Sequence, residues 1–276
     1  METIVISEPV VSVKWLNSHL KSDNLIILDA SIKKVVGGND NVTEIQIPNT
    51  RFFDLKEAFS DASAPFPTTF PSEQQFTKSA QALGINSNSA IVVYDDKGIY
   101  SSARSWWLFK AMGHKNVAVI NGGLPEWIKE GFKTELKRKL NSSKGNFEAT
   151  YNPRYMKYFD DVKEASSFKS HIIIDARSKA RFKSLEPEPR VGLRSGTIPN
   201  SINLPYEDLL NGNKMKTKKI INSKFKTLAK KEDPIIFSCG SGITACVLAL
   251  GAEISGYKNI SVYDGSWTEW GTLVAE

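Results

Sequence analysis

The sequence predicts an α/β fold of two tandem domains, each a mainly parallel sheet flanked by helices. Three observations support this class: the length of 276 residues, an internal repeat, and short apolar runs that alternate with helical patterns. At about 150 residues per domain, this length suits one large or two ordinary domains. Hydrophobic residues make up 41% of the chain, so a core can form without disulfides or metals.

The strongest of these observations is the internal repeat. The motif Ile-Pro-Asn occurs at 47–49 and at 198–200, and Gly-His-Lys-Asn at 113–116 matches Gly-Tyr-Lys-Asn at 256–259. The offset between matching motifs stays between about 143 and 151 residues. A period of this length, present twice, indicates duplicated domains rather than a solenoid.

Each copy is expected to contain three buried strands. These are continuous apolar runs rich in β-branched residues, typical of strands that are covered on both faces. Helical patterns between the runs predict right-handed crossovers and a parallel sheet. The strands are predicted at 25–29, 90–94 and 117–120 in the first copy and at 171–175, 234–238 and 260–263 in the second.

A polar segment rich in turn-forming residues separates the two copies. It begins at 140–146 and ends near 151–153, and such a composition is typical of a linker. We therefore predict a first domain at 1–140, a linker at 141–156 and a second domain at 157–276.

Composition argues against several classes of protein. No apolar run approaches the 18 residues of a membrane span, and the first ten residues, broken by Glu2, Glu8 and Pro9, are not expected to be a secretory signal. The net charge of +6 comes without a basic stripe interleaved with aromatics, so no nucleic-acid partner is predicted. Two cysteines, Cys239 and Cys246, exclude a disulfide scaffold and lack zinc-knuckle spacing. We expect a cytoplasmic protein without metal or cofactor.

The most informative segment joins the strand at 234–238 to a helical run that begins near Thr244. Cys239 stands at the carboxyl end of the strand, where open α/β sheets bind ligands, and Gly240 and Gly242 follow it. The glycines let several backbone N–H groups turn toward one point, and a helix N-terminus behind that point favours an anion. Cys239 is therefore predicted to be a reactive thiolate.

Each cysteine also has an alternative interpretation. Cys239 could be a small buried residue at a strand end, which is the role we expect for Cys246 in the apolar run 245–250. A phosphatase-like loop needs an arginine six residues after the cysteine, where this chain has Ala245. A cysteine protease needs a nearby base, but the histidines are expected at the surface, away from the loop (His19, His114 and His171). Activation by backbone donors is the preferred hypothesis.

The cysteine loop resembles the active loop of 3-mercaptopyruvate sulfurtransferases, in the rhodanese family, with Cys-Gly-Ser-Gly-Ile-Thr-Ala at 239–245. The resemblance implies two tandem rhodanese-like domains, of which the first is catalytically silent. Asp95 stands in the first copy where Cys239 stands in the second, so it cannot carry sulfur. Further motifs extend the resemblance over nearly the whole chain, at 28–31 (LDAS), 52–54 (FFD), 121–127 (NGGLPEW), 175–177 (DAR) and 186–190 (EPEPR).

This resemblance implies a covalent mechanism. The Cys239 thiolate attacks the sulfur of 3-mercaptopyruvate, pyruvate leaves as its enolate, and a Cys239 persulfide remains. A thiol acceptor such as thioredoxin or a small thiol, or cyanide, then takes the outer sulfur. The backbone N–H groups of the loop are expected to hold the thiolate and the persulfide (Gly240, Ser241, Gly242, Ile243 and Thr244).

The resemblance also implies two arginine ligands. Arg181 and Arg190 are expected on the substrate carboxylate and ketone, since a guanidinium matches a carboxylate in bidentate fashion. The alternative for each is a surface ion pair with Glu186 or Glu188. Structural roles are expected for the remaining arginines of this region (Arg177 and Arg194).

Ser241 and Asp54 match a serine and an aspartate that the family uses with the cysteine as a proton relay. The alternative for Asp54 is a helix cap before 55–58. The family often has a histidine in the loop that follows the aspartate, and the segment 64–70 has none. Any role of that histidine is therefore not carried over.

Two rival functions remain open from the residues. Thiosulfate sulfurtransferases of the same fold carry cations at the two positions after the cysteine, where this chain has Gly240 and Ser241. The absence of cations there favours the monoanionic mercapto acid as donor. A noncatalytic sulfur carrier or binding module is the rival from another class, and Arg181 and Arg190 argue against it.

Overall fold

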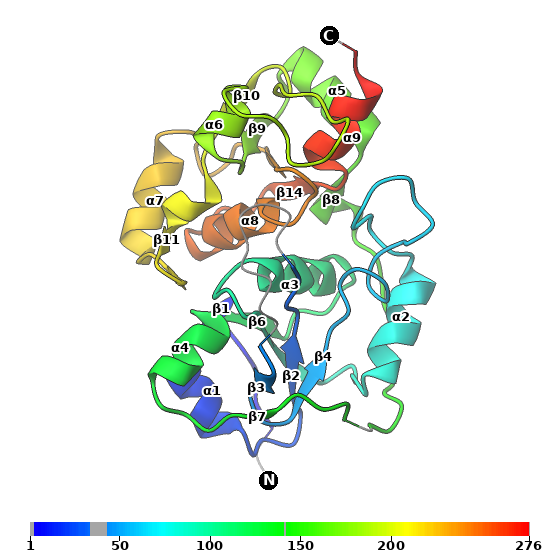
Figure 1. Cartoon of the computed structure of the whole chain (residues 1–276), viewed down its shortest axis with the longest axis vertical. Helices are drawn as coiled ribbons and strands as arrows, with labels where there is room; N and C mark the ends of the chain where they lie inside the picture. The colour runs from blue at the N-terminus through cyan, green and yellow to red at the C-terminus, as the bar shows by residue number, and fades with distance from the viewer. Residues whose placement is uncertain (1–2, 34–42, 141, 276) are drawn as a thin grey trace.

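The computed structural model describes residues 3–33, 43–140 and 142–275, and two five-stranded parallel sheets form its framework (Figure 1). We call the part of the chain before residue 141 the first half and the part after it the second half. The strands of the first sheet are β1 (Val10–Val11), β2 (Leu25–Asp29), β4 (Thr50–Phe52), β5 (Ala90–Tyr94) and β6 (Val117–Ile120). Those of the second are β8 (Met156–Lys157), β9 (Ile172–Asp175), β10 (Ser201–Asn203), β13 (Ile235–Ser238) and β14 (Ile260–Tyr263).

The two sheets have the same topology. The first has the order β1-β6-β5-β2-β4, and the second has the order β8-β14-β13-β9-β10, which matches it strand for strand. Every pairing within the two sheets is parallel. The predicted fold class, an α/β chain with two tandem sheets flanked by helices, is confirmed.

Helices cover the sheets, and two small antiparallel pairs lie outside them. The pairs are β3 (Ile45–Gln46) with β7 (Glu135–Leu136), and β11 (Leu210–Asn211) with β12 (Lys214–Met215). The helices of the first half are α1 (Val13–His19), α2 (Glu73–Ala82), α3 (Ser101–Ala111) and α4 (Gly123–Lys129). Those of the second are α5 (Phe159–Phe168), α6 (Lys179–Phe182), α7 (Lys218–Lys226), α8 (Ala245–Ile254) and α9 (Ser266–Leu273), with 3-10 turns η1 (Pro153–Tyr155) and η2 (Tyr206–Leu209). No described helix is both long and apolar enough to cross a membrane.

All six predicted strands are present, and β9 and β13 begin only one residue later than predicted. Within the two five-stranded sheets, the strands that the sequence pattern missed are β1, β4, β8 and β10, which have two or three residues each and form the sheet edges. Runs this short carry no readable hydrophobic periodicity. Their strand character comes from pairing with a neighbour that is already in place.

The two halves share one hydrophobic core. Helices α3 and α8 pack against each other between the two sheets (Figure 1). Trp106 and Trp107 of α3 are fully buried there, and Lys110 of α3 forms an ion pair with Glu253 of α8. Because α3 follows β5 and α8 follows β13, this packing brings the loops at the carboxyl ends of the two central strands toward each other.

The polar segment after residue 141 follows the surface of the first half. Gly145 N–H donates to Gln81 O, and the side chain of Phe147 is buried in the shared core. The division into 1–140, 141–156 and 157–276 stays a proposal. Residues 1–2, 34–42, 141 and 276 lie outside the described residues.

Candidate active site

The cysteine loop lies between the end of β13 and the start of α8. Cys239 is only 2% exposed and borders a cavity of about 330 Å³. Most of the predicted site residues meet at this cavity, where Gly240, Ser241, Ile243, Thr244, Arg181 and Arg190 also line the wall. The structure therefore brings together residues that are up to 63 positions apart in the chain, from Arg181 to Thr244.

Helix α9 holds the loop from behind. Ser266 Oγ accepts hydrogen bonds from the N–H groups of Cys239 and Gly242, both at 3.1 Å, and donates to Tyr263 O. Gly242 has a φ of +74°, and a Cβ there would stand 2.6 Å from Asp264 O. Glycine is required at 242 for both reasons.

The front of the loop presents unused backbone donors. Within the described part of the chain, the N–H groups of Gly240, Ser241, Ile243 and Thr244 donate to no other residue. Helix α8 begins directly behind them at Ala245 without a side-chain cap. Unsatisfied donors at a helix N-terminus favour a bound anion, and the nearest group able to become one is the Cys239 thiol.

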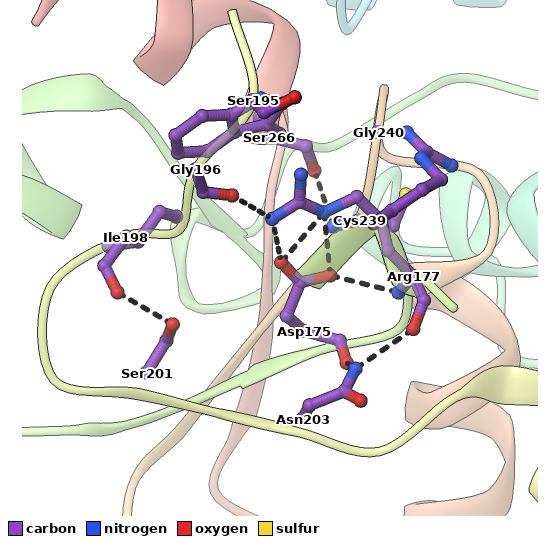
Figure 2. A network of polar contacts seen from close by, with 12 residues as sticks. Asp175, Arg177, Ser195, Gly196, Ile198, Ser201, Asn203, Cys239, Gly240 and Ser266 are labelled. Atoms are coloured by element: carbon purple, nitrogen blue, oxygen red, sulfur yellow. Dashed lines mark hydrogen bonds and ion pairs between the residues drawn. The ribbon is translucent and has the colours of Figure 1, made fainter. Parts of the chain in front are cut away.

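A buried ion-pair network lies beside Cys239 and supports one wall of the cavity (Figure 2). The Arg177 guanidinium donates to Asp175 Oδ2 at 2.6 Å, to Glu188 Oε1 at 2.8 Å and to Gly196 O at 2.9 Å. It also stacks over the Trp267 ring, 4.7 Å from the centroid. Burial alone lowers the pKa of Arg177, but the two carboxylates outweigh it and raise that pKa. These contacts agree with the structural role predicted for Arg177.

Arg181 is anchored by the same network. Its Nη2 donates to Glu188 Oε2 at 2.5 Å, so the ion pair considered as its alternative role is present. The guanidinium also lies against the cysteine loop, because a Cβ on Gly240 would stand 3.0 Å from Arg181 Nη2. Arg181 therefore reaches the cavity with its charge already balanced by Glu188.

Arg190 differs from Arg181 in having no such partner. Among the described residues its side chain forms no hydrogen bond and no ion pair, so neither Glu186 nor Glu188 is in direct contact with its guanidinium. Burial lowers its pKa, the nearby Cys239 opposes that change, and Arg181 adds to it. Arg190 brings an uncompensated positive charge to the cavity that holds Cys239.

A second cavity, of about 470 Å³, adjoins the first. Tyr100, Arg190, Ser241 and Ile243 line both cavities, and the segment 64–68 of the first half lines only the second. The Ser241 hydroxyl has no hydrogen-bond partner among the described residues, so it is available to a molecule in either cavity.

Asp54 lies at the start of the turn that follows β4. Asp54 Oδ1 accepts from the N–H groups of Lys56 and Glu57 and so caps the turn that follows it. Asp54 is not among the described residues that line either cavity. The cap considered as its alternative role is present, over a turn rather than a helix, and its part in a relay stays a proposal.

One histidine prediction is wrong. His114 is 4% exposed, packs beside Phe109 and Phe147, and hydrogen-bonds Ser89 O through Nε2. It was predicted at the surface, but the end of α3 is covered by the segment around Phe147. None of the three histidines lines a cavity with Cys239, and no cluster of metal-ligand types exists among the described residues.

Cys246 has the core position predicted for it. It is fully buried in α8, its Sγ donates to Gly242 O, and burial raises the pKa of its thiol to about 12. Sequence analysis missed Ser266, although a signal was present. Asp264-Gly265-Ser266 repeats the earlier Asn121-Gly122-Gly123, and a side chain in place of a glycine indicates a new contact.

Known proteins resemble the chain in sequence and in fold. A model of the rhodanese-like domain matches residues 12–130 and again 159–273. The chain is 38% identical to thiosulfate/3-mercaptopyruvate sulfurtransferase 1, mitochondrial, of Arabidopsis thaliana, over 96% of this chain and 76% of the relative. It is 35% identical to 3-mercaptopyruvate sulfurtransferase of Homo sapiens, over 94% of this chain and 91% of the relative.

A solved structure agrees with these sequence matches. The crystal structure of the Escherichia coli 3-mercaptopyruvate sulfotransferase SseA superposes with a TM-score of 0.84 at 32% identity, over 95% of this chain and 99% of that one. Each of the two matched ranges contains most of one of the parallel sheets, and the cysteine loop lies in the second range. The chain therefore belongs to the rhodanese family and is a sulfurtransferase built from two rhodanese-like domains.

Proposed function

We propose that the enzyme moves sulfur from 3-mercaptopyruvate through a Cys239 persulfide to a thiol acceptor and releases pyruvate. The human and E. coli relatives are named for this donor. The observation that supports the proposal most directly is the cavity, in which Cys239 lies beside unused loop N–H groups and the uncompensated charge of Arg190. A monoanionic mercapto acid needs one nucleophile, one carboxylate ligand and one donor for developing charge, and this cavity supplies all three.

In the first step, the Cys239 thiolate attacks the donor sulfur and a sulfur–sulfur bond forms. The carbon–sulfur bond breaks, and its electron pair stays on carbon as the enolate of pyruvate, which then takes a proton. Arg190 holds the carboxylate, since a guanidinium with no competing carboxylate is free to bind one. Arg181, already oriented by Glu188, supports the ketone oxygen as negative charge develops on it.

In the second step, the acceptor thiolate attacks the outer sulfur of the persulfide. The sulfur–sulfur bond to Cys239 breaks and returns the electron pair to that cysteine as a thiolate, which the loop N–H groups stabilise. Ser241 and Asp54 belong to the proposal as a proton relay. Ser241 is the better supported of the two, because it lines both cavities, whereas Asp54 is not among the described residues that line them.

Thiosulfate is the second candidate donor, since the Arabidopsis relative is named for both donors. The loop favours 3-mercaptopyruvate, because Gly240 and Ser241 place no cation next to the transferred sulfur. Pyruvate release from 3-mercaptopyruvate with dithiothreitol, compared with sulfite release from thiosulfate with cyanide, tests the choice. A higher kcat/KM for thiosulfate would contradict the proposed donor, and no turnover of either donor would contradict the whole assignment.

The acceptor and the location belong to the same proposal. A thioredoxin-like protein or a small thiol can approach Cys239 through the first cavity, which this cysteine borders, and both cysteines are free thiols. We infer a cytoplasmic location from these two unpaired cysteines. The Arabidopsis relative is mitochondrial by its name, so fractionation of the native cells decides the compartment.

A further inference from the structure

The peptide group between Ser241 and Gly242 is held at both ends. Ser241 O accepts a hydrogen bond from Thr68 Oγ1 at 2.8 Å, and Gly242 N–H donates to Ser266 Oγ at 3.1 Å. Ser266 belongs to the second half, whereas Thr68 comes from the first half, 173 positions away in the chain. We propose that Thr68 is a positioning residue that fixes the orientation of the 241–242 peptide and thereby the N–H cradle around Cys239.

The orientation of this peptide matters for an anion. Gly242 has a positive φ of +74°, and glycine populates both signs of φ readily, so the adjoining peptide can rotate at little cost. A rotated peptide would turn the Ser241 carbonyl toward the side where the unused N–H groups gather. A carbonyl dipole there repels a thiolate, whereas the N–H groups attract it.

Thr68 occupies its place at a conformational cost. Its φ is +59°, which is an outlier for a β-branched residue. The residue is only 9% exposed. Its Oγ1 also lies 2.6 Å from Pro67 O, so its one proton is shared between that carbonyl and Ser241 O. Backbone strain of this kind persists only where the surroundings enforce it, and it gathers at functional sites.

A buried ion pair between the two halves enforces it here. Arg104 of α3, 1% exposed, donates from Nη2 to Thr68 O at 2.9 Å and to Asp264 Oδ1 at 2.6 Å. Asp264 Oδ2 in turn accepts from Phe70 N–H at 2.8 Å. Asp264 and Ser266 begin the segment that supports the cysteine loop from behind, so the strained residue and the loop share one support.

This inference rests on the proposed function only in taking Cys239 as the nucleophile. The test therefore measures the reactivity of the Cys239 thiol itself. The rate of alkylation by iodoacetamide at pH 7, followed by peptide mass spectrometry, reports how well the loop stabilises the thiolate. Thr68→Val removes the hydroxyl and keeps the branched shape. Thr69→Val is the matched control, because Thr69 Oγ1 donates to Phe66 O within its own loop.

Thr68→Val is expected to slow alkylation of Cys239 by roughly threefold to tenfold, the range of one ordinary hydrogen bond. It is expected to lower kcat for 3-mercaptopyruvate by a similar factor with little change in KM. Thr68→Ser keeps the hydroxyl and should restore both rates to within about twofold of wild type. Thr69→Val should leave both rates unchanged.

Thr68→Gly separates positioning from simple support of the fold. Glycine adopts a φ of +59° without strain, so this variant should unfold near the wild-type temperature and yet alkylate as slowly as Thr68→Val. If both variants alkylate at the wild-type rate, or if alkylation only follows the unfolding temperature, the positioning role is overturned. The wild-type enzyme could instead fail to consume 3-mercaptopyruvate while the Thr68 variants still slow the alkylation of Cys239. That result would overturn the proposed donor and leave the positioning role intact.

Discussion

The loops that follow β5 and β13 have the same backbone design and opposite chemistry. Gly98 and Gly242 stand three residues after Asp95 and Cys239, and both have a positive φ, of +101° and +74°. In the first half, the Asp95 carboxylate accepts from the N–H groups of Lys97, Tyr100 and Ser102, at 2.8–2.9 Å. The first loop is thus filled by an anion from its own sequence.

The second loop leaves the matching donors open. The N–H groups of Ser241 and Thr244, which correspond to those of Lys97 and Tyr100, donate to no residue in the described parts of the chain. Cys239 is too short to reach around as an aspartate does, so the cradle is available to its thiolate and to a persulfide. The difference between the two halves teaches that one side chain decides whether this loop is a structural cap or a reaction site.

The backs of the two loops differ at one further position. Gly123 supports the first loop, and a Cβ on it would stand 2.3 Å from Asp95 O. Ser266 takes the matching place in the second half with a φ of +50°, and its Oγ binds Cys239 N–H and Gly242 N–H. The second loop therefore sits far enough away to accept a side chain, which then becomes its anchor.

The largest effect is expected from removing the difference between the loops. Cys239→Asp should turn the second loop into a copy of the first, since the carboxylate can accept from the open N–H groups. We expect no measurable sulfur transfer, and an unfolding temperature at least equal to that of wild type. Intact-mass spectrometry after donor treatment should show one added sulfur on wild type and none on the variant.

Two further variants serve as controls for the assignment of Cys239 as the nucleophile. Cys239→Ser should also abolish transfer, because a serine hydroxyl is not ionised at neutral pH, but without the gain in stability. Cys246→Ala should keep most of the activity, since Cys246 lies in the core behind the loop. Persulfide found on Cys246, or turnover by Cys239→Ser, would contradict the assignment of the nucleophile.

The next effect concerns the two arginines that line the first cavity beside Cys239. Arg190→Ala should lower kcat/KM for 3-mercaptopyruvate about ten- to hundredfold, because a hydrogen bond to a charged group contributes about 1.5–3 kcal/mol. Arg181→Ala should cost less, since Glu188 already neutralises Arg181. Steady-state kinetics with varied donor decide the order, and a larger loss in Arg181→Ala would reverse the two roles.

A stability effect is expected from opening the first loop. Asp95→Ala leaves three N–H groups without their acceptor. That of Ser102 is buried, and an unsatisfied buried group costs about 1–3 kcal/mol. Urea unfolding should show a lower free energy of unfolding, while donor kinetics measured below the transition should stay near wild type. A stable Asp95→Ala protein would mean that the carboxylate is not what holds the first loop.

The smallest effect is expected from adding a cation beside the nucleophile. Ser241→Lys should raise the ratio of thiosulfate to 3-mercaptopyruvate kcat/KM, because sulfite leaves with its charge next to the transferred sulfur. A change of several-fold is expected, since exposed charge pairs contribute about 0.2–1 kcal/mol. If the ratio is unchanged in the same buffer, loop charge does not select the donor.

Sequence alone determined the repeat, the six long strands and the chemical character of the cysteine loop. Continuous apolar runs indicate buried parallel strands. The glycines at 240 and 242, which follow Cys239, already predict backbone N–H groups turned toward one point. The resemblance to a known family predicted both arginines as substrate ligands. It did not predict that one of them has an ion-pair partner and the other has none. Only the structure shows that Glu188 neutralises Arg181 and that no described residue neutralises Arg190.

Contacts across the two halves are what the tertiary structure alone decided. Thr68 and Arg104 of the first half bind Ser241 O and Asp264 of the second half, and no periodicity or spacing links such residues. The edge strands were also decided by the tertiary structure, because two or three residues become a strand only beside a partner. Local sequence fixes what a segment can form, whereas the packing of α3 against α8 fixes which distant groups meet, and the site depends on both.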